Sequence, residues 1–219
     1  MADRSVLADV ELFRVLSPEA FEEVAALATR RSLERGDVLF DEGEEASELY
    51  VVERGRIAIA SRSADGRESV FALMGPGDIF GEIALFDGGG RSAGARALEG
   101  SGVFVLAYAA LQEVLQRQPE LLWGVVAVLA RRLRSMDAVL ADSVFLDVTG
   151  RTAKRLLDLA GDEDEFQLPI TQEELAGLVG ASRERVNKAI SSFIKLGWVE
   201  QRDRRYKITN REQLAIRSR

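Results

Sequence analysis

Residues 170–197 read ITQEELAGLVGASRERVNKAISSFIKLG, and this stretch decides the fold of the C-terminal part of the chain. Thr171, followed three residues later by Glu174, forms a capping-box pattern that predicts the start of a helix. Gly180 can take the positive φ of a tight turn, and Ser182 is a suitable cap for a second helix. We therefore predict two short helices joined by a turn, which is a helix-turn-helix.

The exposed face of the second helix is rich in charge. Its first turns present Arg183, Glu184, Arg185, Asn187 and Lys188. A recognition helix brings its N-terminal residues to base edges in the major groove, where Arg and Lys suit guanine and Glu suits cytosine. A merely solvated helix more often carries acids at its N-terminus. Residues 199–208 then read as two strands of a wing, with arginines at its tip that suit phosphate contacts: Arg202, Arg204 and Arg205. The pattern favours DNA binding.

Composition limits the rest of the chain, which has 219 residues, a net charge of −7 and neither cysteine nor histidine. Without these residues there is no disulfide, iron–sulfur cluster or zinc finger, and we expect no metal site. Residues 1–150 carry a net charge of −10, whereas residues 182–219 carry +7. An acidic body with a basic end indicates that only the end meets a polyanion, although a solvated basic tail would have the same composition.

Residues 31–107 have the pattern of a β-rich domain. Glycines recur between short apolar runs, and Asp65-Gly66 between two such runs predicts a hairpin. Many short strands at this spacing predict a β-sandwich or β-barrel. A jelly-roll of the metal-binding enzyme type would carry a histidine cluster, which this chain lacks.

A long helix is predicted from Pro119 to about residue 145. Apolar side chains recur along it with the spacing of a coiled-coil seam: Leu122, Val126, Leu129, Leu133, Met136 and Leu140. The narrow stripe favours a homodimer over a helix packed only on its own barrel. A hinge is expected next, where Asp147 can cap a new helix: Phe145, Leu146 and Asp147.

Three motifs, taken together, resemble one protein family: GEIALF at 81–86 followed by RSA at 91–93, FLDVTGR at 145–151, and GASRE at 180–184. They are similar to those of the cyclic-AMP receptor protein and fumarate–nitrate regulator (CRP/FNR) family of transcriptional regulators. The resemblance covers essentially the whole chain. It implies an α+β fold with an N-terminal jelly-roll β-barrel of the cyclic-nucleotide-binding type (1–118), a coiled-coil dimerisation helix (119–145) and a C-terminal winged helix-turn-helix that binds DNA (146–219).

The resemblance further implies a cyclic nucleotide as effector. Arg91 and Ser92 would hold the cyclic phosphate, with backbone from Gly81. Glu82 would take the ribose 2′-hydroxyl and pair with Arg132. The implied pocket walls are Ile59, Phe71 and Ala93. The chemistry agrees, because arginine supplies a fixed charge and serine a hydroxyl for a phosphate. Taken alone, an arginine in a glycine-rich loop is a weak signal, and the alternative is a loop arginine that pairs with Asp87.

The chain departs from the family where the base is read. Met136-Asp137 stands where members that bind cyclic AMP have two small polar residues. Met136 falls on the seam and cannot supply a hydroxyl. Asp137 can accept one bond from adenine's amine, or two from the ring NH and amine of guanine. Cyclic AMP is therefore the expected effector, cyclic GMP the alternative, and a regulator that works without nucleotide the third possibility.

The resemblance also implies that a homodimer binds double-stranded DNA with TGTGA-type half-sites in inverted repeat, and that RNA polymerase is a partner. The family's base-reading positions correspond to Arg183, Glu184 and Lys188, while Ser182 and Arg185 would contact phosphate. Lys188 replaces an arginine and so keeps the charge but loses the fork geometry.

Two other classes of protein compete with this interpretation. A nucleotide-binding module that regulates an enzyme would have no use for a helix-turn-helix with a basic wing. A carboxylate-based enzyme would need paired acids in a motif, and none stands out, so we expect no enzyme. No apolar run approaches the ~18 residues of a membrane span and no signal peptide opens the chain, so we expect a cytoplasmic protein without membrane contact.

Overall fold

The computed structural model describes residues 5–10, 13–14, 16–62 and 68–219. These residues form two compact units, one from the described parts of 1–66 and 71–133 and the other from those of 67–70 and 134–219. The long helix α5 (Leu122–Phe145) has its residues up to Leu133 in the first unit and the rest in the second. The two units are described separately.

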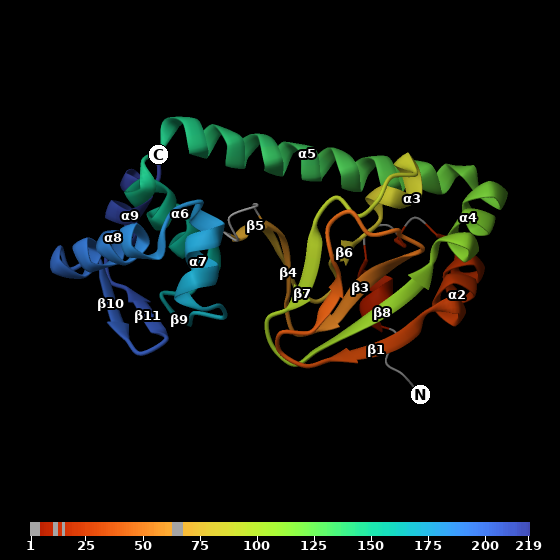
Figure 1. Ribbon diagram of the computed structural model, residues 1–219, viewed down its shortest axis with the longest axis horizontal. Helices are drawn as coiled ribbons and strands as arrows, with labels where there is room; N and C mark the ends of the chain where they lie inside the picture. Colours follow the sequence, from red (N-terminus) through yellow and green to blue (C-terminus); the bar gives the residue numbers. More distant parts are fainter. Residues whose placement is uncertain (1–4, 11–12, 15, 63–67) are drawn as a thin grey trace. The chain divides into compact units, whose positions relative to one another are not determined.

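Two four-stranded sheets form the framework of the first unit, with strand orders β1-β8-β3-β6 and β2-β7-β4-β5 (Figure 1), although the residues of β5 up to Val70 are assigned to the second unit. The strands are β1 (Thr29–Leu33), β2 (Val38–Phe40), β3 (Glu48–Arg54), β4 (Ile57–Arg62), β5 (Glu68–Met74), β6 (Ile79–Phe80), β7 (Gly94–Ala97) and β8 (Ser101–Ala107). The predicted β-rich domain is confirmed. Strands β4 and β5 are neighbours in their sheet, but the Asp65-Gly66 turn predicted between them lies outside the described residues.

Strand β3 shows why this sequence forms the core of a two-layered β domain. Successive side chains of a strand point to opposite faces. Leu49 and Val51 join one apolar cluster, while Tyr50 and Val52 join the other, and all four are buried. Because both faces of β3 are covered, its residues read as an apolar run rather than as an alternating pattern.

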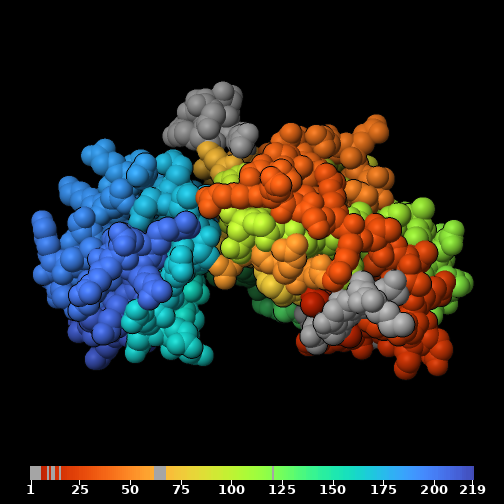
Figure 2. Space-filling view, turned by 90° about the horizontal axis from the view of Figure 1, so that it is seen from below, coloured from red at the N-terminus to blue at the C-terminus, as the bar shows by residue number. Residues whose placement is uncertain are grey.

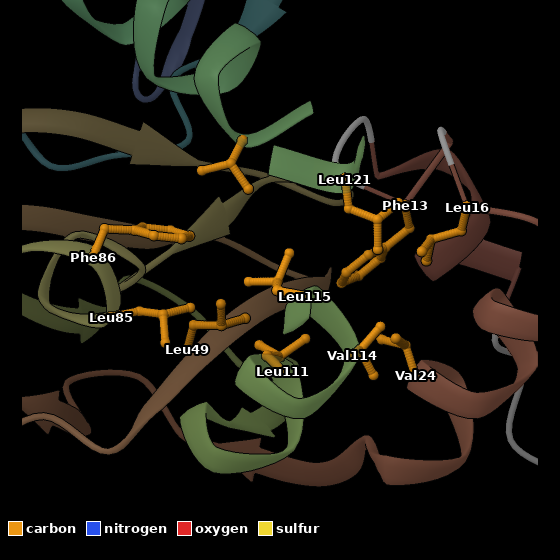
Figure 3. Close-up of a pocket in the computed structure, with 11 residues that line it drawn as sticks. Phe13, Leu16, Val24, Leu49, Leu85, Phe86, Leu111, Val114, Leu115 and Leu121 are labelled. Atoms are coloured by element: carbon orange, nitrogen blue, oxygen red, sulfur yellow. The ribbon is translucent and has the colours of Figure 1, made fainter. Parts of the chain in front are cut away.

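Helices cover the face of the sheet that holds Leu49 and Val51. They are α1 (Ser5–Asp9), α2 (Pro18–Leu27), α4 (Tyr108–Arg117), the 3-10 turn η1 (Pro119–Leu121) and the start of α5, while the short α3 (Ile83–Asp87) follows β6. Their apolar side chains point toward one another around a small cavity of about 20 Å³ (Figure 3). Pro119 begins η1 and not α5, so the long helix starts slightly later than predicted.

One face of α5 packs on the first unit and another is left uncovered. Val125 is buried and Val128 packs against the apolar cluster beneath it. The predicted seam lies elsewhere on the helix: Leu129 is half-buried, and the exposed members are Leu122, Val126, Leu133, Met136 and Leu140. The helix therefore packs on its own unit and still presents an apolar stripe.

The second unit contains four further helices and a three-stranded antiparallel sheet of order β10-β11-β9 (Figure 1). Its elements are α6 (Val148–Ala160), β9 (Glu165–Gln167), α7 (Gln172–Val179), α8 (Arg183–Lys195), β10 (Val199–Arg202), β11 (Arg205–Ile208) and α9 (Arg211–Arg217). Strand β9 was not predicted, because the acidic run at 162–165 has the composition of a loop.

Helix caps fix the ends of the helices in this unit as the sequence predicts. Thr171 and Glu174 form the reciprocal capping box of α7, and the Ser182 hydroxyl accepts from the backbone N–H of Arg185 at the start of α8. Gly180 takes the left-handed conformation between the two helices, with φ of 67°. Asp147 caps α6 by accepting from the backbone N–H of Gly150. The predicted helix-turn-helix is therefore present.

Candidate functional site

A cavity of about 50 Å³ in the first unit gathers most of the residues predicted to bind a ligand. Of the predicted set it is lined by Ile59, Gly81, Arg91, Ser92, Ala93 and Arg132. Glu82 lies next to it in sequence and is only 3 % exposed. Phe71 is exposed and lies outside this lining, and Met136 and Asp137 belong to the part of α5 in the second unit.

Arg91 is the most unusual side chain of the cavity. It is only 6 % exposed, and its guanidinium stands over the Phe40 ring with 4.0 Å from Cζ to the ring centroid. Its Nη1 donates to the carbonyl oxygen of Gly81 (3.0 Å), while its Nε is buried without a hydrogen-bond partner. It forms no ion pair with any described residue, and Asp87 accepts instead from the backbone N–H of Gly89. A buried cation without a carboxylate is costly unless an anion binds it.

Glu82 supplies the opposite charge, but only one of its two carboxylate oxygens has a hydrogen-bond partner among the described residues. Its Oε1 accepts from Arg132, which also donates to the carbonyl oxygen of Ile79. Its Oε2 is buried and has no partner. Although Glu82 is the N-cap of α3, its side chain makes no capping bond. The free oxygen is therefore an acceptor available to a hydroxyl of a ligand.

Gly81 holds these groups together through its backbone. Its φ is 77°, and a Cβ at this position would lie 2.7 Å from Nη1 of Arg91. Any other residue would be strained and would also displace the guanidinium. The Gly81 carbonyl accepts a second bond, from the hydroxyl of Tyr108. Burial raises the pKa of Tyr108, so the hydroxyl stays protonated at neutral pH.

Sequence reasoning missed several residues of this site, among them Phe40, Met74 and Tyr108. Phe40 and Met74 line the cavity, and Tyr108 contacts Arg91 and Gly81. Phe40 and Met74 come from strands whose pairing is set by distant parts of the chain, and Tyr108 begins a helix. No local motif marks any of them, which is why only the three-dimensional arrangement identifies them.

The apolar cavity beneath α4 has a different character. Its lining consists of apolar side chains alone, among them Phe13, Leu49, Leu85 and Leu111 (Figure 3). It offers no polar group to fix a ligand, and about 20 Å³ leaves room for little more than one water molecule. We interpret it as part of the core.

In the second unit, the predicted DNA-contacting side chains are exposed, and they belong to the segment 182–205, which Figure 2 colours blue. Those of α8 and its cap are exposed: Ser182, Arg183, Glu184, Arg185 and Lys188. Arg202 and Arg205 face each other across β10 and β11, and neither forms an ion pair with a described residue. Arg204 differs, because its Nη2 donates to the carbonyl oxygens of Leu168 and Ile170 at 3.4 Å.

The predicted hinge lies within the second unit, where α5 ends and α6 begins. Phe145 is exposed, Leu146 is buried, and Asp147 pairs with Arg217 of α9 as well as capping α6. Arg151 reinforces this region by donating to the carbonyl oxygens of Leu146 and Val179. Among the described residues, no group of three or more acids could hold a metal ion.

Comparison with known proteins gives the same architecture. Residues 30–118 match the cyclic nucleotide-binding domain family, and residues 150–216 match the Crp-like helix-turn-helix domain family. A CRP-like cAMP-activated global transcriptional regulator of Mycobacterium tuberculosis is 38 % identical, over 98 % of this chain and 99 % of that protein. The chain belongs to the CRP/FNR family. Membership of this family of transcriptional regulators confirms the resemblance and the expectation that the protein is no enzyme.

Three further proteins resemble the chain to different extents. The cAMP-activated global transcriptional regulator Vfr of Pseudomonas aeruginosa is 33 % identical, over 81 % of this chain and 88 % of its own length. The structure of the Thermus thermophilus catabolite activator protein is 31 % identical, with a TM-score of 0.55 over 95 % of this chain and 98 % of that one. FixK2 from Bradyrhizobium japonicum has a TM-score of 0.80 at 22 % identity, over 88 % of this chain and 98 % of that one, and shows the fold alone.

No helix within the described ranges is both long and apolar enough to cross a bilayer.

Proposed function

We propose that this CRP/FNR regulator binds cyclic AMP in its first unit and that the nucleotide controls DNA binding by its helix-turn-helix. One observation carries the proposal: Arg91 is buried without an acid, while Glu82 keeps one buried oxygen free. A ligand that satisfies both must bring an anion and a hydroxyl donor. A cyclic phosphate and a ribose 2′-hydroxyl are such a pair, and relatives of this chain are named as cAMP-activated regulators.

Each side chain of the cavity then has a defined task. Arg91 and Ser92 hold the cyclic phosphate, and Glu82, fixed by Arg132, accepts from the ribose hydroxyl. Apolar walls that include Ile59 and Ala93 cover the rest of the ligand. These walls offer the base little polar contact, so we propose that Asp137 recognises the base. A carboxylate at this position suits guanine as well as adenine, which keeps cyclic GMP as the alternative effector.

Isothermal titration calorimetry with cyclic AMP and with cyclic GMP tests the proposal. We expect binding of cyclic AMP by the wild type and a loss of about 100-fold or more in Arg91→Ala, since charged hydrogen bonds are lost. Asp137→Ala should change the ratio of the two affinities, while Ser32→Ala, an exposed position of β1 that does not line the cavity, should not. A wild type that binds neither nucleotide would refute the effector and leave a regulator that works without one.

We further propose that the protein acts as a homodimer through the α5 seam. The exposed leucines support this, because a solvated helix seldom keeps an apolar stripe while another of its faces is already packed. Leu133→Glu and Leu140→Glu together should turn a dimer into a monomer in analytical ultracentrifugation. The paired control Arg134→Glu changes a neighbouring charge outside the seam and should leave the dimer intact.

The proposed DNA target is an inverted repeat of TGTGA-type half-sites, read by Arg183, Glu184 and Lys188, with phosphate contacts from Ser182 and Arg185. Recruitment of RNA polymerase would follow at the promoter. In fluorescence anisotropy, Arg183→Ala should cost about 1–3 kcal/mol of binding free energy and relax base preference at one position. Equal binding of the inverted repeat and of a scrambled duplex by the wild type would refute sequence-specific recognition.

A further inference from the structure

The Arg91 guanidinium is held by the protein on two sides before any ligand is considered. The Phe40 ring lies 4.0 Å from Cζ. Nη1 points to the Gly81 carbonyl oxygen (3.0 Å) and to the Tyr108 hydroxyl oxygen (3.3 Å). A free arginine side chain samples many rotamers, and a ligand that had to order it would bind more weakly. This arrangement has already restricted the side chain.

The Tyr108 hydroxyl has a defined direction within this group. Its single proton is donated to the Gly81 carbonyl oxygen, so toward Arg91 it can act only as an acceptor. One oxygen atom therefore connects the guanidinium to the backbone of the residue that precedes Glu82. Its ring contributes a buried face, because Tyr108 is the first residue of α4 and packs in the core beside Leu111.

We propose that Tyr108 is a positioning residue for the cyclic phosphate: its hydroxyl fixes where Arg91 points relative to Gly81. This inference rests on the proposed binding of a cyclic nucleotide. Tyr108 does not touch the phosphate itself. It sets which of the two non-bridging phosphate oxygens meets the guanidinium, because Nη1 is already bonded to Gly81 and Tyr108, whereas Nε has no partner among the described residues and is left for the phosphate.

The two phosphate oxygens can be distinguished by experiment. In the Sp and Rp phosphorothioate analogues of cyclic AMP, sulfur replaces one or the other non-bridging oxygen, and sulfur accepts hydrogen bonds more weakly. If Arg91 is fixed, the two analogues bind the wild type with different affinities. If Arg91 can reorient, the difference shrinks.

The test compares wild type, Tyr108→Phe and Tyr50→Phe by calorimetry with cyclic AMP and both analogues. Tyr50 is the matched control, since its ring also lies near Arg91 (5.6 Å from Cζ to the ring centroid) but its hydroxyl donates to Glu48 and to neither Arg91 nor Gly81. We expect Tyr108→Phe to bind cyclic AMP about tenfold more weakly and to move the Sp/Rp affinity ratio toward one. Tyr50→Phe should keep the wild-type ratio.

Every outcome decides the proposal. If Tyr108→Phe weakens all three ligands equally, Tyr108 is only structural and the proposal is overturned although nucleotide binding stands. If the wild type binds none of the three, the proposed function itself fails and the inference falls with it. Should Tyr108→Phe not fold by circular dichroism, Phe40→Leu removes the opposite side of the same arrangement and must shift the ratio in the same direction.

Discussion

At the scale of single residues, the three wing arginines differ in what their guanidinium groups contact. Arg204 donates to the Leu168 and Ile170 carbonyl oxygens, whereas Arg202 and Arg205 are exposed and form no ion pair with a described residue. We therefore expect Arg202→Ala and Arg205→Ala each to lower the salt slope of DNA binding by about 0.9, as the loss of one phosphate contact does. Arg204→Ala should leave the slope unchanged and weaken the wing.

Anisotropy titrations of one duplex at several salt concentrations measure these slopes. Lys195→Ala, at the opposite end of α8 from the residues proposed to contact DNA, serves as the charge control. If Arg204→Ala lowers the slope as much as Arg205→Ala, then Arg204 contacts phosphate and its bonds to the two carbonyl groups do not persist on DNA.

Asp147 gives a prediction about pH. Its pKa is lowered, first because its carboxylate accepts from the backbone N–H of Gly150 and further because it pairs with Arg217. A carboxylate whose pKa is lowered in the folded state contributes its full stabilisation above its ordinary pKa of about 4. This stabilisation is lost as the pH falls through the pKa of the folded state. Asp147→Ala should therefore lower the free energy of unfolding by about 1 kcal/mol at pH 7 and by less at pH 3.

Urea unfolding followed by Trp198 fluorescence measures this difference in a Trp123→Phe background, because Trp198 stacks on Phe193 within the second unit. Arg217→Ala removes only the ion pair, whose partner Asp147 is largely exposed, and should cost a few tenths of a kcal/mol. If the free energies of unfolding of the wild type and of Asp147→Ala differ as much at pH 3 as at pH 7, the charge of the carboxylate does not contribute to stability.

At the scale of elements, the sequence predicted what depends on neighbours in the chain. The caps at Asp147, Thr171 and Ser182 each bind a backbone N–H three residues on, so the pattern and the bond lie in the same short stretch. Strand β9 depends instead on pairing with β11 across about forty residues of chain. The acidic run in which it begins has the composition of a loop, so the sequence alone did not predict a strand there. The contact of Tyr108 with Arg91 escaped prediction for the same reason: it joins a helix start to a distant loop.

The turn between α7 and α8 gives an element-scale prediction. A Cβ at Gly180 would meet nothing within 4 Å, so the only cost of a side chain is its left-handed φ of 67°. Gly180→Ala should lower the free energy of unfolding of the second unit by about 1 kcal/mol, and Gly180→Asn by less, because asparagine tolerates this conformation. Equal effects in urea unfolding would mean that space around the turn, and not φ, limits the residue.

At the scale of the whole molecule, the proposed function requires coupling between two units. Coupling is a free energy shared by two ligands, so it must be reciprocal. If cyclic AMP raises the affinity for the inverted repeat by some factor, that duplex must raise the affinity for cyclic AMP by the same factor, on the order of 5- to 150-fold. The motifs in the sequence indicated both binding functions, but neither motif contains the coupling, which we propose to run through α5 and the predicted hinge.

Two titrations at one salt concentration measure this reciprocity: DNA with and without saturating cyclic AMP, and cyclic AMP with and without saturating DNA. A scrambled duplex should leave the nucleotide affinity unchanged, since only the specific complex selects one state. Arg91→Ala should abolish both shifts, because it removes the ligand that biases the equilibrium. If the two affinity changes differ by more than the experimental error, a third process, such as a change of oligomeric state, accompanies one of the binding steps. Two factors equal to one would mean that each unit binds its partner independently, and the proposed switch would be refuted.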